Sequence, residues 1–286
     1  MSLSDNIPLP PETPEQVQSP PGAPELAGAD RALPEDLRAP WGWLDLFVLA
    51  VLAVAGSILI SLSLTAVFAA FGIKFAQLRA SPGESGLFTI VNQLLLSVAL
   101  LGFLAAHVRR SFGAPFWRTI GWRGFQPSQL PRALRYLGFI LGGFLLAVAV
   151  QVASLSFGSN AKVPMQALFE DRRTAIALLL MAVFVAPVVE ETIFRGYIYP
   201  VVARSWGIAP GIFVTGVLFG LFHAPQLWGG WVQIASIVVV GIVFTFARAL
   251  TRTVFASYLL HVSYNFSISF AFLLGSHWLR LLSPGH

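Results

Sequence analysis

Long apolar stretches constrain the fold of this chain more than any other feature. Seven stretches are nearly free of charge: 44–72, 87–106, 136–155, 174–204, 210–224, 231–247 and 254–274. About 20 apolar residues in a helix cross the hydrocarbon core of a bilayer. Inside lipid, a helix satisfies every backbone hydrogen bond within its own segment. The sequence therefore predicts an all-α, polytopic membrane bundle of seven transmembrane helices, or eight if Pro187 divides the fourth stretch.

The overall composition supports this class and excludes others. Of 286 residues, 56% are hydrophobic and 11% are charged, and the mean hydropathy is +0.74. Soluble domains carry about 25% charged residues. The chain has no cysteine, which excludes disulfides, thiolate metal sites and a cysteine nucleophile.

The chain divides into three parts. Residues 1–40 contain nine prolines and an excess of acids, and we expect a disordered cytoplasmic tail. Residues 41–157 hold the first three stretches, and Trp41 and Trp43 are typical of an anchor at the membrane interface. Residues 158–286 hold the remaining stretches and the polar motifs discussed below.

The positive charge indicates an orientation. The connection 109–135 holds six arginines and no acid, together with aromatic residues suited to the interface. The positive-inside rule places this connection, and with it the N-terminus, in the cytoplasm and the C-terminus outside. Because no soluble basic domain carries the charge, we expect a lipid bilayer as its partner and no nucleic acid.

Two adjacent carboxylates and an arginine interrupt the fourth stretch. A charged side chain near the bilayer centre costs at least ~2.5–3.5 kcal/mol on insertion scales, so such residues usually mark a function. Glu191 and Arg195 are four residues apart and can pair on one helix face. Glu190 points about 100° away and faces something else. Pro187 would kink the helix just before this site and free a carbonyl.

Polar residues from two further stretches reach a similar depth. With a rise of ~1.5 Å per residue from the expected cytoplasmic helix ends, Glu190 lies ~21 Å deep, His223 ~24 Å and His261 ~12 Å. His261 and Asn265 share a helix face and could both donate N–H groups to a developing oxyanion. An ordinary interhelical hydrogen bond is the alternative for each. His107, His277 and His286 lie at membrane edges or the terminus, and we expect no role for them.

Together these residues resemble the motifs of the CPBP family of intramembrane proteases, which includes the Rce1-type CAAX-processing endopeptidases and bacterial relatives. The family pattern EExxxR, FxxxH and HxxxN/D is matched in order by Glu190-Glu191-xxx-Arg195, Phe219-xxx-His223 and His261-xxx-Asn265. The resemblance implies hydrolysis of a peptide bond in a membrane-associated protein or peptide. It implies Glu190 as general base, His223 as its partner in activating water, and His261 with Asn265 as the oxyanion site. Glu191, Arg195 and Phe219 would support them.

Three questions stay open at this stage. A zinc ion held by Glu190, His223 and His261 is an alternative to a metal-free water mechanism, which we prefer because Asn265 is a poor zinc ligand. The alternatives to an enzyme are a non-proteolytic scaffold or immunity-type protein and a proton-coupled carrier. The short chain and the EExxFRG form resemble prokaryotic members, which implies a prokaryotic plasma membrane.

Overall fold

The computed structural model describes residues 34–74, 76, 82–125, 127–128, 130–157 and 164–275. These residues form helices and connections, with no β-strand among them. The predicted all-α membrane bundle is confirmed. The prediction of a disordered tail concerns residues 1–33 in large part, and these lie outside the described residues.

Six helical segments are long and apolar enough to cross a membrane. They are α2 (Trp43–Ala70), α4 (Pro82–Phe112), α6 (Arg132–Phe157), the segment Arg172–Trp206, α11 (Trp231–Thr251) and α12 (Val254–Gly275). The seventh predicted span is α10 (Ile208–His223), which has only 16 residues. At ~1.5 Å per residue α10 is about 24 Å long, shorter than the ~30 Å hydrocarbon core.

The segment Arg172–Trp206 is one continuous helical rod, so Pro187 does not divide it. Along the rod lie α7 (Arg172–Leu180), the π-helical η3 (Met181–Val185), α8 (Ala186–Glu191), the π-helical η4 (Thr192–Ile198) and α9 (Tyr199–Trp206). The Asp171 carboxylate accepts the N–H of Thr174 at 2.8 Å and so caps the first turn. That hydrogen bond lowers the pKa of Asp171 below its ordinary value.

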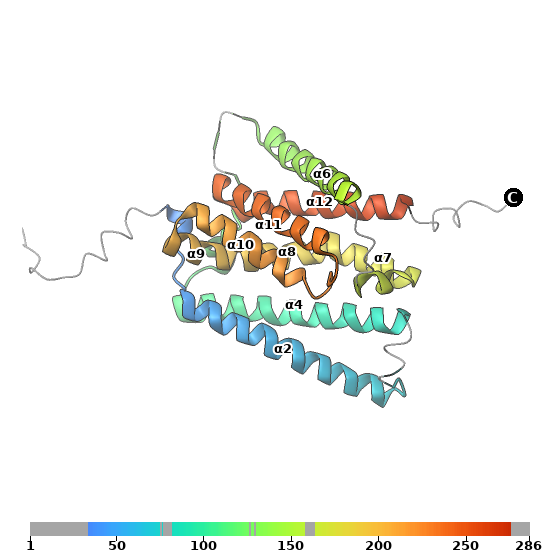
Figure 1. The fold of residues 1–286 in the computed structure, drawn as a ribbon. Helices are drawn as coiled ribbons and strands as arrows, with labels where there is room; N and C mark the ends of the chain where they lie inside the picture. Colours follow the sequence, from blue (N-terminus) through green and yellow to red (C-terminus); the bar gives the residue numbers. More distant parts are fainter. Residues whose placement is uncertain are drawn as a thin grey trace, which may run out of the picture. The chain divides into compact units, whose positions relative to one another are not determined.

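Small residues allow the helices that carry the motifs to pack closely. At Gly216 and Gly220 of α10, an added Cβ would lie 2.4 Å from Ile242 and 2.2 Å from Val238 of α11. Their GxxxG spacing therefore places two glycines at a close contact between α10 and α11. On α6 the close contact is at Gly143, where an added Cβ would lie 2.4 Å from the Leu260 carbonyl oxygen of α12. An added Cβ at Gly138 would meet no atom within 4 Å. Figure 1 shows α6 beside α12, and α2 beside α4.

The segment 34–42, which we call the strap, is folded against the bundle, contrary to the predicted end of the tail at residue 40. It contains the short helix η1 (Glu35–Leu37), and Leu37 is buried beside Tyr199. Asp36 forms a buried ion pair with Arg248 at 2.7 Å. Arg204 donates to the carbonyls of Ala39 and Trp41. Several contacts therefore hold the strap to α9 and α11.

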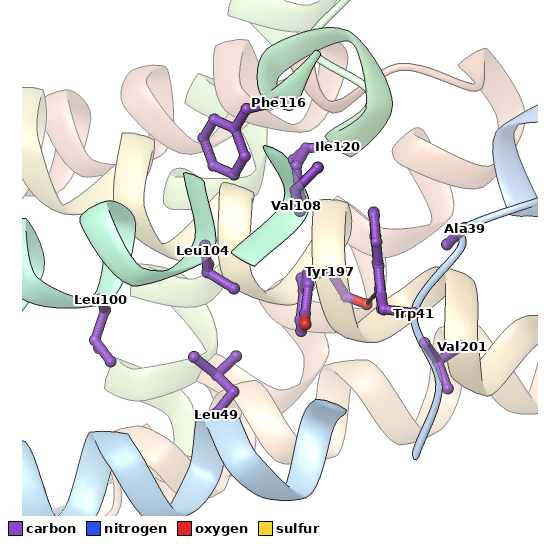
Figure 2. Close-up of a cluster of buried hydrophobic side chains, with 10 residues drawn as sticks. All are labelled: Ala39, Trp41, Leu49, Leu100, Leu104, Val108, Phe116, Ile120, Tyr197 and Val201. Atoms are coloured by element: carbon purple, nitrogen blue, oxygen red, sulfur yellow. Dashed lines mark hydrogen bonds between the residues drawn. The ribbon is translucent and has the colours of Figure 1, made fainter. Parts of the chain in front are cut away.

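Trp41 is buried rather than interfacial, so half of the predicted aromatic anchor is wrong. Its ring is 1% exposed and stacks on Tyr197 at 4.7 Å, and its indole N–H donates to the Tyr197 carbonyl at 2.9 Å. Figure 2 shows the two rings at the centre of a cluster that also draws side chains from α2, α4 and α5 (Phe116–Ile120). Trp43 is 46% exposed, as an interfacial residue requires.

The basic connection also packs more deeply than a segment lying on the interface. Phe116, Ile120 and Phe125 are buried, and Trp117 is exposed. The Trp122 indole N–H donates to the hydroxyl of Thr192 in η4 at 2.9 Å. The connection and the strap thus both contact the helix that carries the acidic motif.

Candidate active site

The Glu191–Arg195 pair forms as the i,i+4 spacing predicts. The two side chains are joined at 3.0 Å, and both are fully buried. Arg195 also donates to the Gly241 carbonyl at 2.9 Å and to the Thr245 hydroxyl at 3.2 Å. Its guanidinium lies 4.4 Å from the centre of the Phe219 ring. The cation is therefore fully engaged inside the bundle.

Sequence reasoning missed the contribution of α11 to this cation. Gly241 and Thr245 are four residues apart and share a face, with Phe244 beside them. Phe244 is fully buried and its ring lies 5.4 Å from Arg195 and 4.8 Å from His261. The only signal of this contact in the sequence was one face of an apolar helix that combines a small residue, a hydroxyl and an aromatic ring.

Glu190 is separate from that pair, as predicted, and lies near both motif histidines. Its Oε1 is 3.9 Å from His223 Nε2, and its Oε2 is 3.7 Å from His261 Nε2. The Glu190 and His223 side chains are 14% and 17% exposed. Both separations exceed a direct hydrogen bond. The three groups from three segments therefore converge around one small space.

The tautomer of His223 follows from its own helix. Its Nδ1 lies 2.8 Å from the Phe219 carbonyl one turn earlier. Because a carbonyl can only accept, Nδ1 carries the proton. In the neutral ring Nε2 is then a free lone pair directed towards Glu190. The FxxxH spacing thus both supplies the ring and orients it.

His261 is held by the second motif carboxylate. Its Nδ1 lies 2.8 Å from Glu191 Oε1, the same oxygen that accepts from Arg195. A carboxylate paired with Arg195 is an acceptor, so Nδ1 is the donor. The Nε2 atom then carries a proton only when His261 is an imidazolium. When Glu190 and Glu191 are ionised and His261 is an imidazolium, their charges and that of Arg195 sum to zero.

Asn265 has a hydrogen bond that the sequence did not anticipate in detail. Its Nδ2 donates to the Ala182 carbonyl at 2.7 Å. In η3 the N–H of Ala186 bonds to the Met181 carbonyl, five residues back. The next N–H in that pattern would serve Ala182, but residue 187 is proline and has none. Asn265 therefore satisfies the carbonyl that Pro187 leaves free, and its amide retains one further N–H.

A cavity of about 500 Å³ opens beside these groups. It is lined by the four predicted catalytic residues Glu190, His223, His261 and Asn265. Leucine, isoleucine and phenylalanine side chains from α7, α10, α11 and α12 form much of its wall. The structure thus combines a polar cluster with an apolar cavity of the size that holds a small ligand or a few side chains.

His107 pairs with Asp45 at 2.8 Å, away from the cavity, and His277 and His286 lie outside the described residues. Among the described residues, no group of three His, Asp or Glu side chains is arranged to hold a metal ion. His223 and His261 each commit Nδ1 to the protein and keep Nε2 towards Glu190, an arrangement that zinc-ligating histidines also have. The zinc set of Glu190, His223 and His261 and the metal-free water mechanism therefore both stay predictions.

Comparison with known proteins gives one match. Residues 172–267 match the family model described as type II CAAX prenyl endopeptidase Rce1-like. No curated protein and no solved structure matches the chain. The matched range runs from the start of α7 into α12 and includes all three motifs. The segment of this integral membrane protein that holds every predicted site residue is therefore similar to the Rce1-like family.

Proposed function

We propose that this protein is an intramembrane endopeptidase in which Glu190 activates a water molecule to attack a peptide bond. The observation that carries the proposal is the position of Glu190 between the Nε2 atoms of two oriented histidines, beside an apolar cavity. The Rce1-like match of residues 172–267 supports a CAAX-type protease acting on a membrane-associated protein or peptide.

The nucleophile would lie between Glu190 and His223. Glu190 Oε1 and His223 Nε2 are both acceptors, and their 3.9 Å separation suits one shared water that donates to each. Glu190 takes a proton as the water oxygen attacks the carbonyl carbon. The proton is then passed to the leaving nitrogen, so that an acid and an amine are produced.

The oxyanion would be stabilised from α12. In the imidazolium form His261 donates through Nε2, while Glu191 holds its Nδ1. The second amide N–H of Asn265 is the other donor. Donors placed in advance at a developing oxyanion in a site of low dielectric lower the barrier by several kcal/mol, about 2.7–4 kcal/mol for one donor.

A comparison of membrane-protein fragments tests the activity. Cells carrying wild-type protein, Glu190→Gln or the control Glu170→Gln are compared at equal abundance. Glu170 is exposed and outside the cavity lining. We expect peptides with new termini in the wild type and the control and none in Glu190→Gln. Equal fragment patterns with Glu190→Gln would refute the protease and favour a scaffold.

Two further measurements separate the remaining alternatives. Proton uptake by vesicles containing Glu190→Gln protein should equal that of wild-type vesicles, whereas a carrier would lose it. Cleavage by purified wild-type protein should survive a strong chelator. A loss of cleavage that zinc restores would overturn the metal-free mechanism and make Glu190, His223 and His261 the candidate ligands.

A further inference from the structure

Two pairs of exposed tryptophans mark the two ends of α10. Before α10 begins, the rings of Trp43 and Trp206 lie 5.1 Å apart. After it ends, the rings of Trp228 and Trp231 lie 5.3 Å apart. All four side chains are exposed. Exposed tryptophan in a membrane protein is typical of the boundary between hydrocarbon and headgroups. The apolar height of this side of the bundle is therefore bounded at both ends.

The turn after α10 limits that height further. α10 ends at His223, and residues 224–229 form turns before α11 begins. Pro225 and Gln226 in these turns are exposed. Backbone outside a regular helix does not face lipid within the hydrocarbon, because its polar groups would lack partners there. The hydrocarbon beside α10 therefore ends close to the ends of its 16 residues, which measure about 24 Å.

α2 starts at the same level as α10 but is much longer. Its first residue is Trp43, whose indole N–H donates to the Ser205 hydroxyl at 2.9 Å, just before α10 begins at Ile208. α2 has 28 residues and is about 42 Å long. A tilt of ~40°, at the upper end of the range for membrane helices, still leaves about 32 Å along the membrane normal. The height of α2 thus exceeds the length of α10 by about 8 Å.

The difference in height lies at the end of the bundle where α10 stops. Asn92 of α4 donates to the Ser61 hydroxyl of α2 at 2.5 Å, and the next residue, Gln93, lines the same cavity as His223. The end of α10 is therefore near the level of Ser61. Beyond that level α2 continues to Ala70 without a charged residue, and it exposes large apolar side chains there.

Between its tryptophan pairs α10 presents an apolar surface. One side of α10 packs on α9 and α11. The other side, which we call the α10 face, exposes Ile208, Phe213, Leu218, Leu221 and Phe222. In a membrane such a face is covered by acyl chains, and a hydrocarbon core of ~30 Å exceeds α10 by about 6 Å. Thinning the bilayer has a cost for each Å of mismatch, which shorter acyl chains avoid.

We propose that the α10 face, bounded by its two tryptophan pairs, is a docking surface for phospholipids with short acyl chains, and that the bilayer is thinner beside α10 than beside α2. His223 lines the cavity and is the last residue of α10, so the thin region borders the candidate active site. This lipid selection is independent of the proposed protease activity and of which membrane face is cytoplasmic.

The absence of cysteine from the chain allows a fluorescent label at one chosen position. Bimane is attached at Phe213→Cys on α10 or at Leu59→Cys on α2, where the native side chains are 59% and 64% exposed. Each labelled protein is reconstituted into equal mixtures of dimyristoleoyl and dierucoyl phosphatidylcholine, with one or the other lipid brominated. Bromine quenches bimane on contact. The ratio of the two quenching values therefore reports which chain length collects at each helix.

We expect the shorter lipid to be enriched at least about twofold at Phe213→Cys and not to be enriched at Leu59→Cys. Leu218→Cys, on the same face of α10, should report the same enrichment as Phe213→Cys. A tilt of the whole bundle without local thinning would give equal ratios at the two helices. Equal ratios, or enrichment of the shorter lipid at α2 alone, would overturn the proposal.

Replacing one tryptophan pair tests whether it bounds the surface. Trp228→Leu/Trp231→Leu in the Phe213→Cys background extends the apolar surface and should lower the enrichment by at least about half. Trp117→Leu, which removes an exposed tryptophan of α5, should leave it unchanged. An unchanged enrichment in the double replacement would overturn the role of the pair. A wild type that selects the shorter lipid but cleaves no protein would refute the protease and leave the lipid surface standing.

Discussion

Replacing Arg195 by methionine tests how the buried charges of the site are balanced. Methionine keeps much of the apolar stem of arginine but removes the cation that Glu191 faces at 3.0 Å. Glu191 would keep the hydrogen bond from His261 at 2.8 Å but would face no buried arginine. The Gly241 carbonyl would still accept from Thr245 at 2.7 Å. The main loss is therefore at Glu191 rather than at α11.

The size of the loss follows from the burial of both partners. Both side chains are 0% exposed, and removing one partner of a buried pair costs ~3–5 kcal/mol because the other charge is left unpaired. In the double variant Glu191→Gln/Arg195→Met no unpaired charge remains. We expect it to lie within ~2 kcal/mol of the wild type, so the coupling energy between the two positions should exceed ~1 kcal/mol.

Reversible unfolding of the purified protein in mixed micelles, followed by circular dichroism during SDS titration, measures these free energies. Arg123→Met is the matched control, because Arg123 pairs with Glu35 at 3.1 Å and Glu35 is 75% exposed. An exposed pair contributes ~1 kcal/mol or less. If Arg195→Met costs no more than Arg123→Met, or if the double variant is as unstable as the single one, the account of the charge cluster is refuted.

Three further outcomes follow from the packing, all measurable by the same unfolding titration. Trp41→Ala should cost ~3–5 kcal/mol, because it removes a buried ring and a hydrogen bond to η4. Trp41→Phe keeps an aromatic ring and should cost less. Equal costs for the two variants would contradict the buried position of Trp41. Gly143→Ala should cost ~1–3 kcal/mol because its Cβ meets a backbone oxygen at 2.4 Å, and Gly138→Ala should be near neutral. Asn265→Ala should cost ~1–3 kcal/mol in the wild-type background. In a Pro187→Ala background it should cost at least ~1 kcal/mol less, because the restored N–H of residue 187 can donate to the Ala182 carbonyl. Equal costs in the two backgrounds would contradict that hydrogen-bond assignment.

The sequence was sufficient for those parts of the site that depend on helix periodicity. The pairing of Glu191 with Arg195 follows from a separation of four residues, and the separate direction of Glu190 follows from a rotation of about 100°. The approach of His223 and His261 to Glu190 followed from similar depths on three apolar segments. These are local properties of each helix.

Contacts between segments were less accessible. Thr245 binds the Gly241 carbonyl of its own helix as well as Arg195, and a threonine in a helix usually makes that local bond, so its second role has no local sign. The strap was misassigned because the prolines and acids of residues 1–40 outweigh Leu37 and Ala39 when composition is averaged. Burial of those few residues depends on a surface of α9 that only the folded chain provides.

The two prolines of the motif helix explain how it holds two adjacent carboxylates in different surroundings. Each π-helical segment ends two residues before a proline: η3 before Pro187 and η4 before Pro200. A proline ring clashes with the carbonyl four residues earlier in a regular α-helix, and widening the preceding turn relieves that clash. Only the six residues of α8 lie between the widened turns, and Glu190 and Glu191 are its last two. Pro187 thus leaves the Ala182 carbonyl to Asn265 on one side, while the second widened turn carries Arg195 back to Glu191 on the other. The sequence predicted a kink at one proline, but a widened turn precedes each of the two prolines, and the short helix between these turns ends in the carboxylate that lines the cavity and the one that faces the buried cation.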